Sequence, residues 1–142
     1  MAGRAVFGVI NLGDELNPEI IMIQDSDKRP PAMWKLPGGR CESEESIELA
    51  LRREVEEEIG VALRPGQRIL SETIEGRTSS HVFEAWTVLS NGLIRDQLRS
   101  GNEVKQIEVV TVDDFNRLKS ESRILPHHQA AIEEYFLRFC IV

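Results

Sequence analysis

The chain has 142 residues, of which 41% are hydrophobic and 29% charged, enough for one folded domain with its own core and too few for two ordinary ones. Its formal net charge of -7 argues against a broad basic surface that binds nucleic acid through the phosphate backbone. No apolar run approaches the length of a membrane span, and residues 1–10 lack the pattern of a secretory signal, so we expect a cytoplasmic protein with no membrane partner.

The first quarter of the chain predicts extended segments. Arg4–Asn11 and Glu19–Gln24 are rich in apolar and β-branched residues, which favours β-strands, and the turn-forming residues of Gly13–Pro18 lie between them. The polar residues 25–31 end in two prolines and predict a surface loop. Lys35 and Leu36 are expected to close a short extended segment that runs into a proline and two glycines.

An amphipathic helix is predicted over residues 47–59. At helical spacing, one continuous apolar face is formed by Ile47, Ala50, Leu51 and Val55. Ser46 is the expected N-cap, with Ser43 as the alternative, and Gly60 suits the left-handed residue that ends a helix.

The second half of the chain predicts further strands and two helices. We expect strands over Arg68–Glu75 and His81–Leu89, joined by a Gly76–Ser80 turn, and then a polar loop over Asn91–Asn102. A strand over Val104–Val112 follows. A short helix is expected to be capped by Asp113 or Asp114 and to end at Lys119, and a closing helix begins at Pro126. The sequence shows no repeat, low-complexity tract or linker. Residues 1–142 therefore predict one α/β domain built on a mixed sheet.

Three glutamates at the end of the predicted helix lie where core residues would be expected. Glu54 and Glu58 fall inside the apolar face, and Glu57 lies along its edge. Salt bridges on a solvated helix explain most charge runs, and Arg53 is correctly spaced to pair with Glu57. Glu54 and Glu58, however, have no basic residue three or four positions away. A hard divalent cation such as Mg²⁺ or Mn²⁺, which prefers oxygen ligands, would resolve the repulsion between them.

A sequence motif surrounds these carboxylates. The pattern G-x5-E-x7-R-E-V-x-E-E-x-G-V is formed by Gly39, Glu45, Arg53, Glu54, Val55, Glu57, Glu58, Gly60 and Val61, and it follows Leu36-Pro37-Gly38 directly. This stretch, Gly39–Val61, resembles the Nudix box of the Nudix hydrolases, the MutT-like family, with every defining position filled. The resemblance implies an α/β/α sandwich around a mixed sheet.

The same resemblance implies a reaction and a set of site residues. Nudix enzymes use divalent metal ions to hydrolyse the pyrophosphate bond of a nucleoside diphosphate linked to another group, by attack of water on phosphorus. The implied metal ligands are the carboxylates of Glu54, Glu57 and Glu58 with the backbone carbonyl of Gly38. The implied supporting residues are Gly39, which lets the backbone approach closely, and the ion pair of Glu45 with Arg53, which fixes the loop against the helix.

The catalytic base and the substrate contacts are less closely defined. Glu54 is one candidate base, and Glu103, in a position similar to a downstream family glutamate, is a second candidate for base or metal ligand; Glu108 is expected to be solvated. Candidate substrate contacts are Lys35, Arg77 and Phe83, with Lys28, Trp34 and Trp86 as further candidates and core packing as the alternative for the aromatic residues. His127 and His128 are expected to face solvent unless a third zinc ligand lies nearby.

Three functions remain open at this level. The first is a Mg²⁺- or Mn²⁺-dependent pyrophosphohydrolase acting on a small nucleotide, with a nucleoside triphosphate or a small nucleotide sugar ahead of other substrates because the markers of several Nudix subfamilies are missing. The second is a regulatory domain that binds a nucleotide metabolite without chemistry. The third is an RNA 5′-pyrophosphohydrolase. The sequence leaves open whether the protein is a monomer or a homodimer.

Overall fold

The computed structural model describes residues 3–25, 31–74, 78–101 and 103–142. Its elements follow one another in the order β1 (Gly3–Ile10), β2 (Glu19–Asp25), β3 (Gly38–Arg40), α1 (Ile47–Ile59), β4 (Leu63–Ile74), β5 (Thr78–Thr87), α2 (Asn91–Gln97), β6 (Val104–Thr111), α3 (Val112–Ser120) and α4 (Pro126–Phe139). No helix of the described residues is long and apolar enough to cross a membrane.

A mixed sheet forms the centre of the molecule. Its strands lie in the order β3-β1-β5-β4; β1 and β5 run parallel, and the other neighbours run antiparallel. Strands β2 and β6 form a separate antiparallel pair. Two isolated bridges connect β2 to neighbouring backbone, one between Ile20 and Asn11 and one between Ile23 and Lys35. The pairing of β1 with β5 joins the start of the chain to residues 78–85 at the centre of the sheet.

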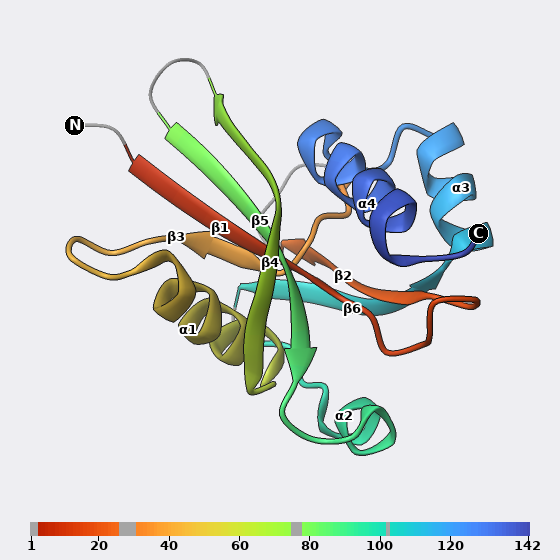
Figure 1. The fold of residues 1–142 in the computed structure, drawn as a ribbon, viewed down its shortest axis with the longest axis horizontal. Coiled ribbons are helices and arrows are strands. Elements are labelled where there is room, and N and C mark those ends of the chain that lie inside the picture. The colour runs from red at the N-terminus through yellow and green to blue at the C-terminus, as the bar shows by residue number, and fades with distance from the viewer. Residues whose placement is uncertain (1–2, 26–30, 75–77, 102) are drawn as a thin grey trace.

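The helices cover opposite faces of this sheet, with α1 on one side and α3 and α4 on the other (Figure 1). Because successive side chains of a strand point to opposite faces, each face has its own apolar cluster. Val55, Ile59 and Phe83 belong to the cluster beneath α1, whereas Ile132 and Tyr135 belong to the one beneath α4. The expected α/β/α arrangement in a single domain is therefore confirmed, and the acidic helix and the closing helix lie on different faces.

The predicted acidic helix is confirmed at both ends. Helix α1 spans Ile47–Ile59, and the hydroxyl of its N-cap Ser46 accepts a hydrogen bond from the amide of Leu49 at 3.2 Å. Gly60 ends the helix with a φ of 74°, a left-handed conformation that glycine adopts without a steric penalty. Ser43 is not the cap.

Several predictions about the second half were wrong. Residues 91–97, expected to lie in a polar loop, form helix α2, because Ile94 is buried in the cluster beneath α1. The cap of α3 is Thr111, not an aspartate; Asp114 instead completes a reciprocal capping box with it. Thr78–Ser80, placed in a turn, belong to β5, and residues 75–77 lie outside the described residues.

Candidate metal and substrate site

The three box glutamates differ in their exposure. Glu58 is buried, with 8% of its surface exposed, and the side chain of Glu54 is 17% exposed. The side chain of Glu57 is 59% exposed and lies 3.3 Å from the guanidinium of Arg53. The apolar face of α1 therefore carries Glu58 and Glu54 toward the sheet, as the helical spacing predicts, whereas Glu57 reaches solvent.

Glu58 has its hydrogen-bond partner on β3. Its Oε1 accepts a hydrogen bond from the amide of Gly38 at 2.7 Å. Burial is the largest influence on this carboxyl and raises its pKa to about 8, against the opposing effects of the Gly38 amide and the Lys35 ammonium. At neutral pH the folded chain therefore holds a buried carboxyl group that lacks enough positive charge to stabilise its ionised form.

Glycine suits both positions of the Gly38-Gly39 pair, for different reasons. Gly38 has a φ of 144°, and a Cβ there would lie 2.1 Å from the carbonyl oxygen of Val6 on β1. A Cβ on Gly39 would lie 2.6 Å from Oε2 of Glu54. The carboxylate of Glu54 thus occupies the space that a side chain at position 39 would fill.

Glu54 also has a raised pKa. Burial is the largest cause; the neighbouring Arg53 opposes it, and the charges of Glu57 and Glu103 add to it. Oε1 of Glu54 accepts a hydrogen bond from Nη1 of Arg53 at 3.1 Å. The partner that the sequence did not predict is therefore the residue directly before it in the chain.

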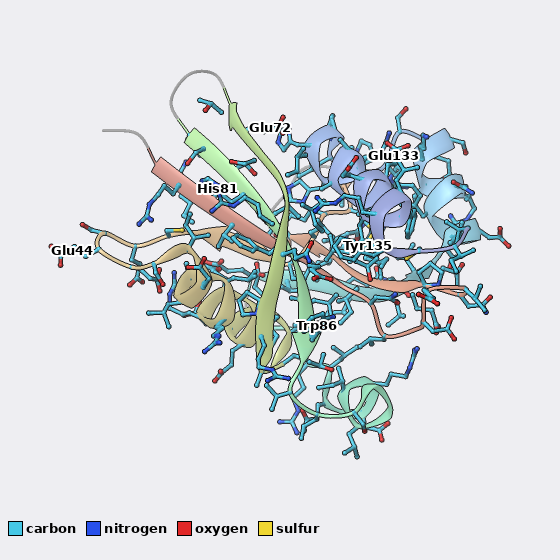
Figure 2. The ribbon with its side chains drawn as sticks, in the orientation of Figure 1. Glu44, Glu72, His81, Trp86, Glu133 and Tyr135 are labelled. Atoms are coloured by element: carbon cyan, nitrogen blue, oxygen red, sulfur yellow. The ribbon has the colours of Figure 1, made fainter. Side chains whose placement is uncertain are left out.

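Arg53 and Glu45 form the ion pair that joins the loop to the helix. Nε of Arg53 donates to Oε2 of Glu45 at 2.8 Å, and Nη2 donates to Oε1 at 3.0 Å. Nη2 also donates to the carbonyl oxygen of Arg40, at 3.1 Å. The hydrogen bonds from Arg53 to Glu45, and then the one from the backbone amide of Glu42, lower the pKa of Glu45 to about 2. Figure 2 shows Glu44, which has a φ of 69°, at the outer end of the loop that this pair closes.

Glu103 is brought to this helix by the segment that precedes β6. The amide of Arg99 donates to the carbonyl oxygen of Ile59 at 3.0 Å, and the amide of Gly101 donates to that of Glu58 at 2.8 Å. These bonds satisfy carbonyl groups that the end of a helix leaves without partners. Glu103 is exposed and acts electrostatically on Glu54, whereas Glu108 is exposed on β6 and accepts a hydrogen bond from Gln106.

A cavity of about 470 Å³ opens near the start of α4. Its lining includes Phe7, Asp25, Met33, Lys35, Leu125 and His128. Asp25 and Lys35 form an ion pair at 3.5 Å, and both act electrostatically on Glu58. The cavity is therefore electrostatically coupled to the acidic end of α1.

The predicted substrate contacts are distributed differently. Lys35 lines the cavity, with its ammonium 5.6 Å from the centre of the Phe7 ring. Phe83 is buried beneath α1 with the guanidinium of Arg68 over its ring, so the core alternative holds for this residue. Trp34 is likewise buried, whereas Trp86 is exposed on β5. Arg77 and Lys28 lie outside the described residues.

The prediction that the two histidines face solvent was wrong for His128. This ring is 3% exposed, and its Nδ1 accepts a hydrogen bond from the amide of Leu36 at 3.0 Å. His127 is half-buried, with Nδ1 3.7 Å from Oε1 of Glu72. Within the described ranges, no three His, Cys, Asp or Glu side chains are placed to hold a metal ion. The two histidines therefore form no zinc site there.

Sequence reasoning missed most of the cavity. Phe7, Asp25 and Met33 were assigned only to a strand or a loop, and His128 was expected at the surface. Lys35, which forms an isolated bridge with Ile23 of β2, is the lining residue that the sequence did indicate as a substrate contact. The residues that line the cavity come from separate strands and a distant helix, so no local spacing connects them.

Comparison with known proteins identifies a common domain. The family model of the NUDIX domain matches residues 1–130. The 8-oxo-dGDP phosphatase NUDT18 of Danio rerio is 45% identical over 67 residues, which are 47% of this chain and 21% of that protein. The chain thus aligns with about a fifth of this relative's length.

Solved structures share the fold. A NUDIX hydrolase from Nitrosomonas europaea superposes with a TM-score of 0.76 and 13% identity, covering 96% of this chain and 70% of the other. The MutT protein from Methanosarcina mazei Go1 gives a TM-score of 0.70 and 21% identity, covering 96% and 94%. At this level of identity the likeness establishes the fold alone.

Proposed function

The chain belongs to the NUDIX domain family, and on that premise we propose that it is a divalent-metal-dependent pyrophosphohydrolase of a small nucleotide. The observation that carries the proposal is the pair of carboxylates at the end of α1, Glu54 and Glu58. Both are withdrawn from solvent and both have raised pKa values, and Glu58 interacts electrostatically with Asp25 and Lys35 of a cavity large enough for part of a nucleotide.

The residues at this site suit a hard divalent cation, which is the usual cofactor of the family. The available donors are carboxylate oxygens, the ligands that Mg²⁺ and Mn²⁺ prefer. Because position 39 is a glycine, the Glu54 carboxylate can lie directly against the backbone there. Glu57 turns toward Arg53, so it would have to leave that guanidinium to join Glu54 and Glu58. We assign Gly38, Glu54, Glu57 and Glu58 as the metal-binding set, with Glu103 as a further candidate. Bound there, the cation would polarise the phosphoryl oxygens and stabilise the charge that develops on them.

The residues of the chain itself would perform the remaining tasks. Glu54 and Glu103 are the two candidates to accept a proton from the attacking water, and the raised pKa of Glu54 makes its carboxylate a stronger base than an ordinary one. The Arg53–Glu45 ion pair would hold the loop and helix in register. Lys35, at the cavity edge, would exchange Asp25 for an anionic oxygen of the substrate.

The substrate is proposed to be a nucleoside di- or triphosphate or a small nucleotide sugar. The cavity combines apolar side chains with the Asp25–Lys35 pair, an arrangement suited to a flat base with a charged group at one end. The name of the Danio rerio relative, an 8-oxo-dGDP phosphatase, adds oxidised guanine nucleotides to the candidates.

A substrate panel tests the proposal. The purified protein would be incubated with Mg²⁺ or Mn²⁺ and nucleoside triphosphates, 8-oxo-dGDP, nucleotide sugars, ADP-ribose or triphosphorylated RNA, and released phosphate and nucleotide would be measured by chromatography. We expect turnover of at least one free nucleotide that EDTA abolishes. Binding of nucleotides by calorimetry without turnover of any panel member would instead establish a regulatory binding domain.

A further inference from the structure

His128 is a buried polar residue that joins two distant parts of the chain. It lies in the first turns of α4, yet its Nδ1 accepts a hydrogen bond from the amide of Leu36, 92 positions earlier. The Phe7 ring packs edge-on against it, with 4.4 Å between ring centres. The position of the imidazole is therefore fixed from two sides.

The hydrogen bond to Leu36 determines which nitrogen carries the proton. A backbone amide can only donate, so Nδ1 must be unprotonated, and the neutral ring carries its hydrogen on Nε2. Burial, which lowers the pKa of this histidine to about 3, also favours the neutral ring. The side chain lines the cavity, and within the described part of the chain Nε2 has no hydrogen-bond partner. The neutral ring of His128 thus adds an N–H donor to the residues that line the cavity, which also include Lys35.

The segment held by His128 leads directly to the carboxylate site. Leu36 is followed by Pro37, whose carbonyl oxygen accepts from the amide of Gly8 at 3.0 Å, and then by Gly38, whose amide donates to Glu58. Gly38 has no free room, because it pairs closely with β1. A displacement of Leu36 is therefore passed along two peptide units to the partner of Glu58.

We propose that His128 is a positioning residue with two separable tasks in the proposed reaction. Its Nδ1 fixes the Leu36–Gly38 segment that holds Glu58, and its Nε2–H donates a hydrogen bond to an acceptor atom on the base of the nucleotide in the cavity. The imidazole thereby links occupation of the cavity to the geometry of the carboxylate. The inference rests on the proposed function for its substrate, but the contacts of the ring can be tested without turnover.

Two substitutions separate the tasks. In His128→Asn the carboxamide oxygen lies close to the position of Nδ1, so it can still accept from Leu36, but the shorter side chain has no donor at the position of Nε2. In His128→Gln the amide nitrogen lies close to the position of Nε2, and Leu36 loses its acceptor. We expect His128→Asn to raise KM about tenfold with little change in kcat, and His128→Gln to lower kcat about tenfold with a smaller change in KM. His81→Asn is the matched control, because His81, labelled in Figure 2, bonds to Ser71 and Ser79 on the strands.

Nuclear magnetic resonance of the metal-free protein provides a readout that does not depend on activity. The ring ¹⁵N spectrum should show the Nε2–H form of His128, and addition of a nucleoside monophosphate should shift the Nε2–H signal. The amide signal of Gly38 should move in His128→Gln and stay in place in His128→Asn. Thermal unfolding would check that both variants fold, and the ring spectrum of the unaltered protein decides the question if one does not.

Other results would overturn the proposal. A ring spectrum with the proton on Nδ1, or an Nε2–H signal that no nucleoside monophosphate shifts, would remove one of the two tasks. Equal effects of the two substitutions on kcat and KM would reduce His128 to a packing residue. If the chain hydrolyses no nucleotide but the ring signal still shifts on binding, the proposed function fails and the ligand contact of His128 stands.

Discussion

The surroundings on the two sides of helix α1 shift the pKa values of acidic residues in opposite directions. On the loop side, Glu45 meets the guanidinium of Arg53 through two hydrogen bonds, and its pKa falls to about 2. On the sheet side, Glu58 is buried with a single amide as its hydrogen-bond partner, and its pKa rises to about 8. A carboxylate paired within the chain holds the structure together. A carboxyl group that is buried without a cation holds its proton at neutral pH, and an external cation would favour its ionised form.

This contrast separates supporting residues from reactive ones on physical grounds. Arg53 satisfies Glu45 and contacts Glu54, but it does not reach Glu58 by any hydrogen bond in the described structure. If the acidic cluster served only stability, its most buried member would be expected to have the strongest cationic partner, since burial of an unpaired charge costs several kcal/mol. The reverse arrangement at Glu58 is typical of a binding site.

The largest expected effect is on catalysis at the sheet side. Glu58→Gln and Glu57→Gln should each lower turnover at least a hundredfold, roughly 2.7 kcal/mol in the barrier, because each removes an anionic oxygen from the proposed metal site. Initial rates with Mg²⁺ on the best substrate of the panel would measure this. Glu56→Gln, on the exposed face of the same helix, is the matched control. Activity equal to that of the unaltered protein in either variant would remove that residue from the reaction.

A second effect of Glu58 concerns stability and has a defined sign. Its pKa rises from 4.5 in the unfolded reference to about 8 in the folded chain, so the folded state holds the proton more tightly. The resulting stabilisation is present below pH 4.5 and is lost as the pH rises toward 8, by on the order of a few kcal/mol. Urea unfolding of the metal-free protein at several pH values should show this loss, and Glu58→Gln should remove most of it.

Adding a metal ion in the same unfolding experiment should have the opposite effect on stability. At pH 8, Mg²⁺ should restore the free energy of unfolding of the unaltered protein, because a ligand that binds only the folded state stabilises it. Glu58→Gln should show little response to the same Mg²⁺ concentration. If the two proteins had the same pH dependence, the buried carboxyl would not be the group that titrates.

Substitution on the loop side should act in the reverse direction. Glu45→Gln exchanges a charged acceptor of Arg53 for a neutral one, so we expect the melting temperature at pH 7 to fall by a few degrees. Glu58→Gln should leave it unchanged or raise it in the metal-free protein, since the carboxamide can still accept from Gly38 and cannot ionise. Differential scanning calorimetry of the two variants side by side measures the contrast. A lower melting temperature in both would mean that the two sides of α1 do not differ in the way described.

Substitution of Gly38 or Gly39 by alanine tests the same site through steric contacts. Gly39→Ala places a methyl group where the Glu54 carboxylate lies, at 2.6 Å from its oxygen, while the end of a flexible side chain can move away. We expect the fold to persist and turnover to fall roughly tenfold, as a displaced catalytic group typically causes. Gly38→Ala meets the Val6 carbonyl instead and should reduce stability. Circular dichroism and rates measured together distinguish the two.

The sequence predicted the acidic helix well because every local signal agreed. The apolar spacing, the Ser46 cap and the left-handed Gly60 all lie within the helix or next to it, and each acts over one turn. Helix α2 and the burial of His128 were not predictable in that way. Ile94 of this polar segment packs into the apolar cluster beneath α1, and the buried His128 accepts from the amide of Leu36. These outcomes depend on partners far away in the chain.

Substitution of Glu103 is expected to have the smallest effect on turnover, and it tests whether Glu103 or Glu54 is the catalytic base. It is exposed, and its interaction with Glu54 is electrostatic, whereas Glu58 is enclosed and hydrogen-bonded. Glu103→Gln should therefore reduce turnover less than Glu57→Gln or Glu58→Gln does. Because its charge raises the pKa of Glu54, its removal should also move the acid side of the pH–rate profile to lower pH, since Glu54 would then ionise more easily. A hundredfold loss of turnover with no such displacement would instead make Glu103 the base itself.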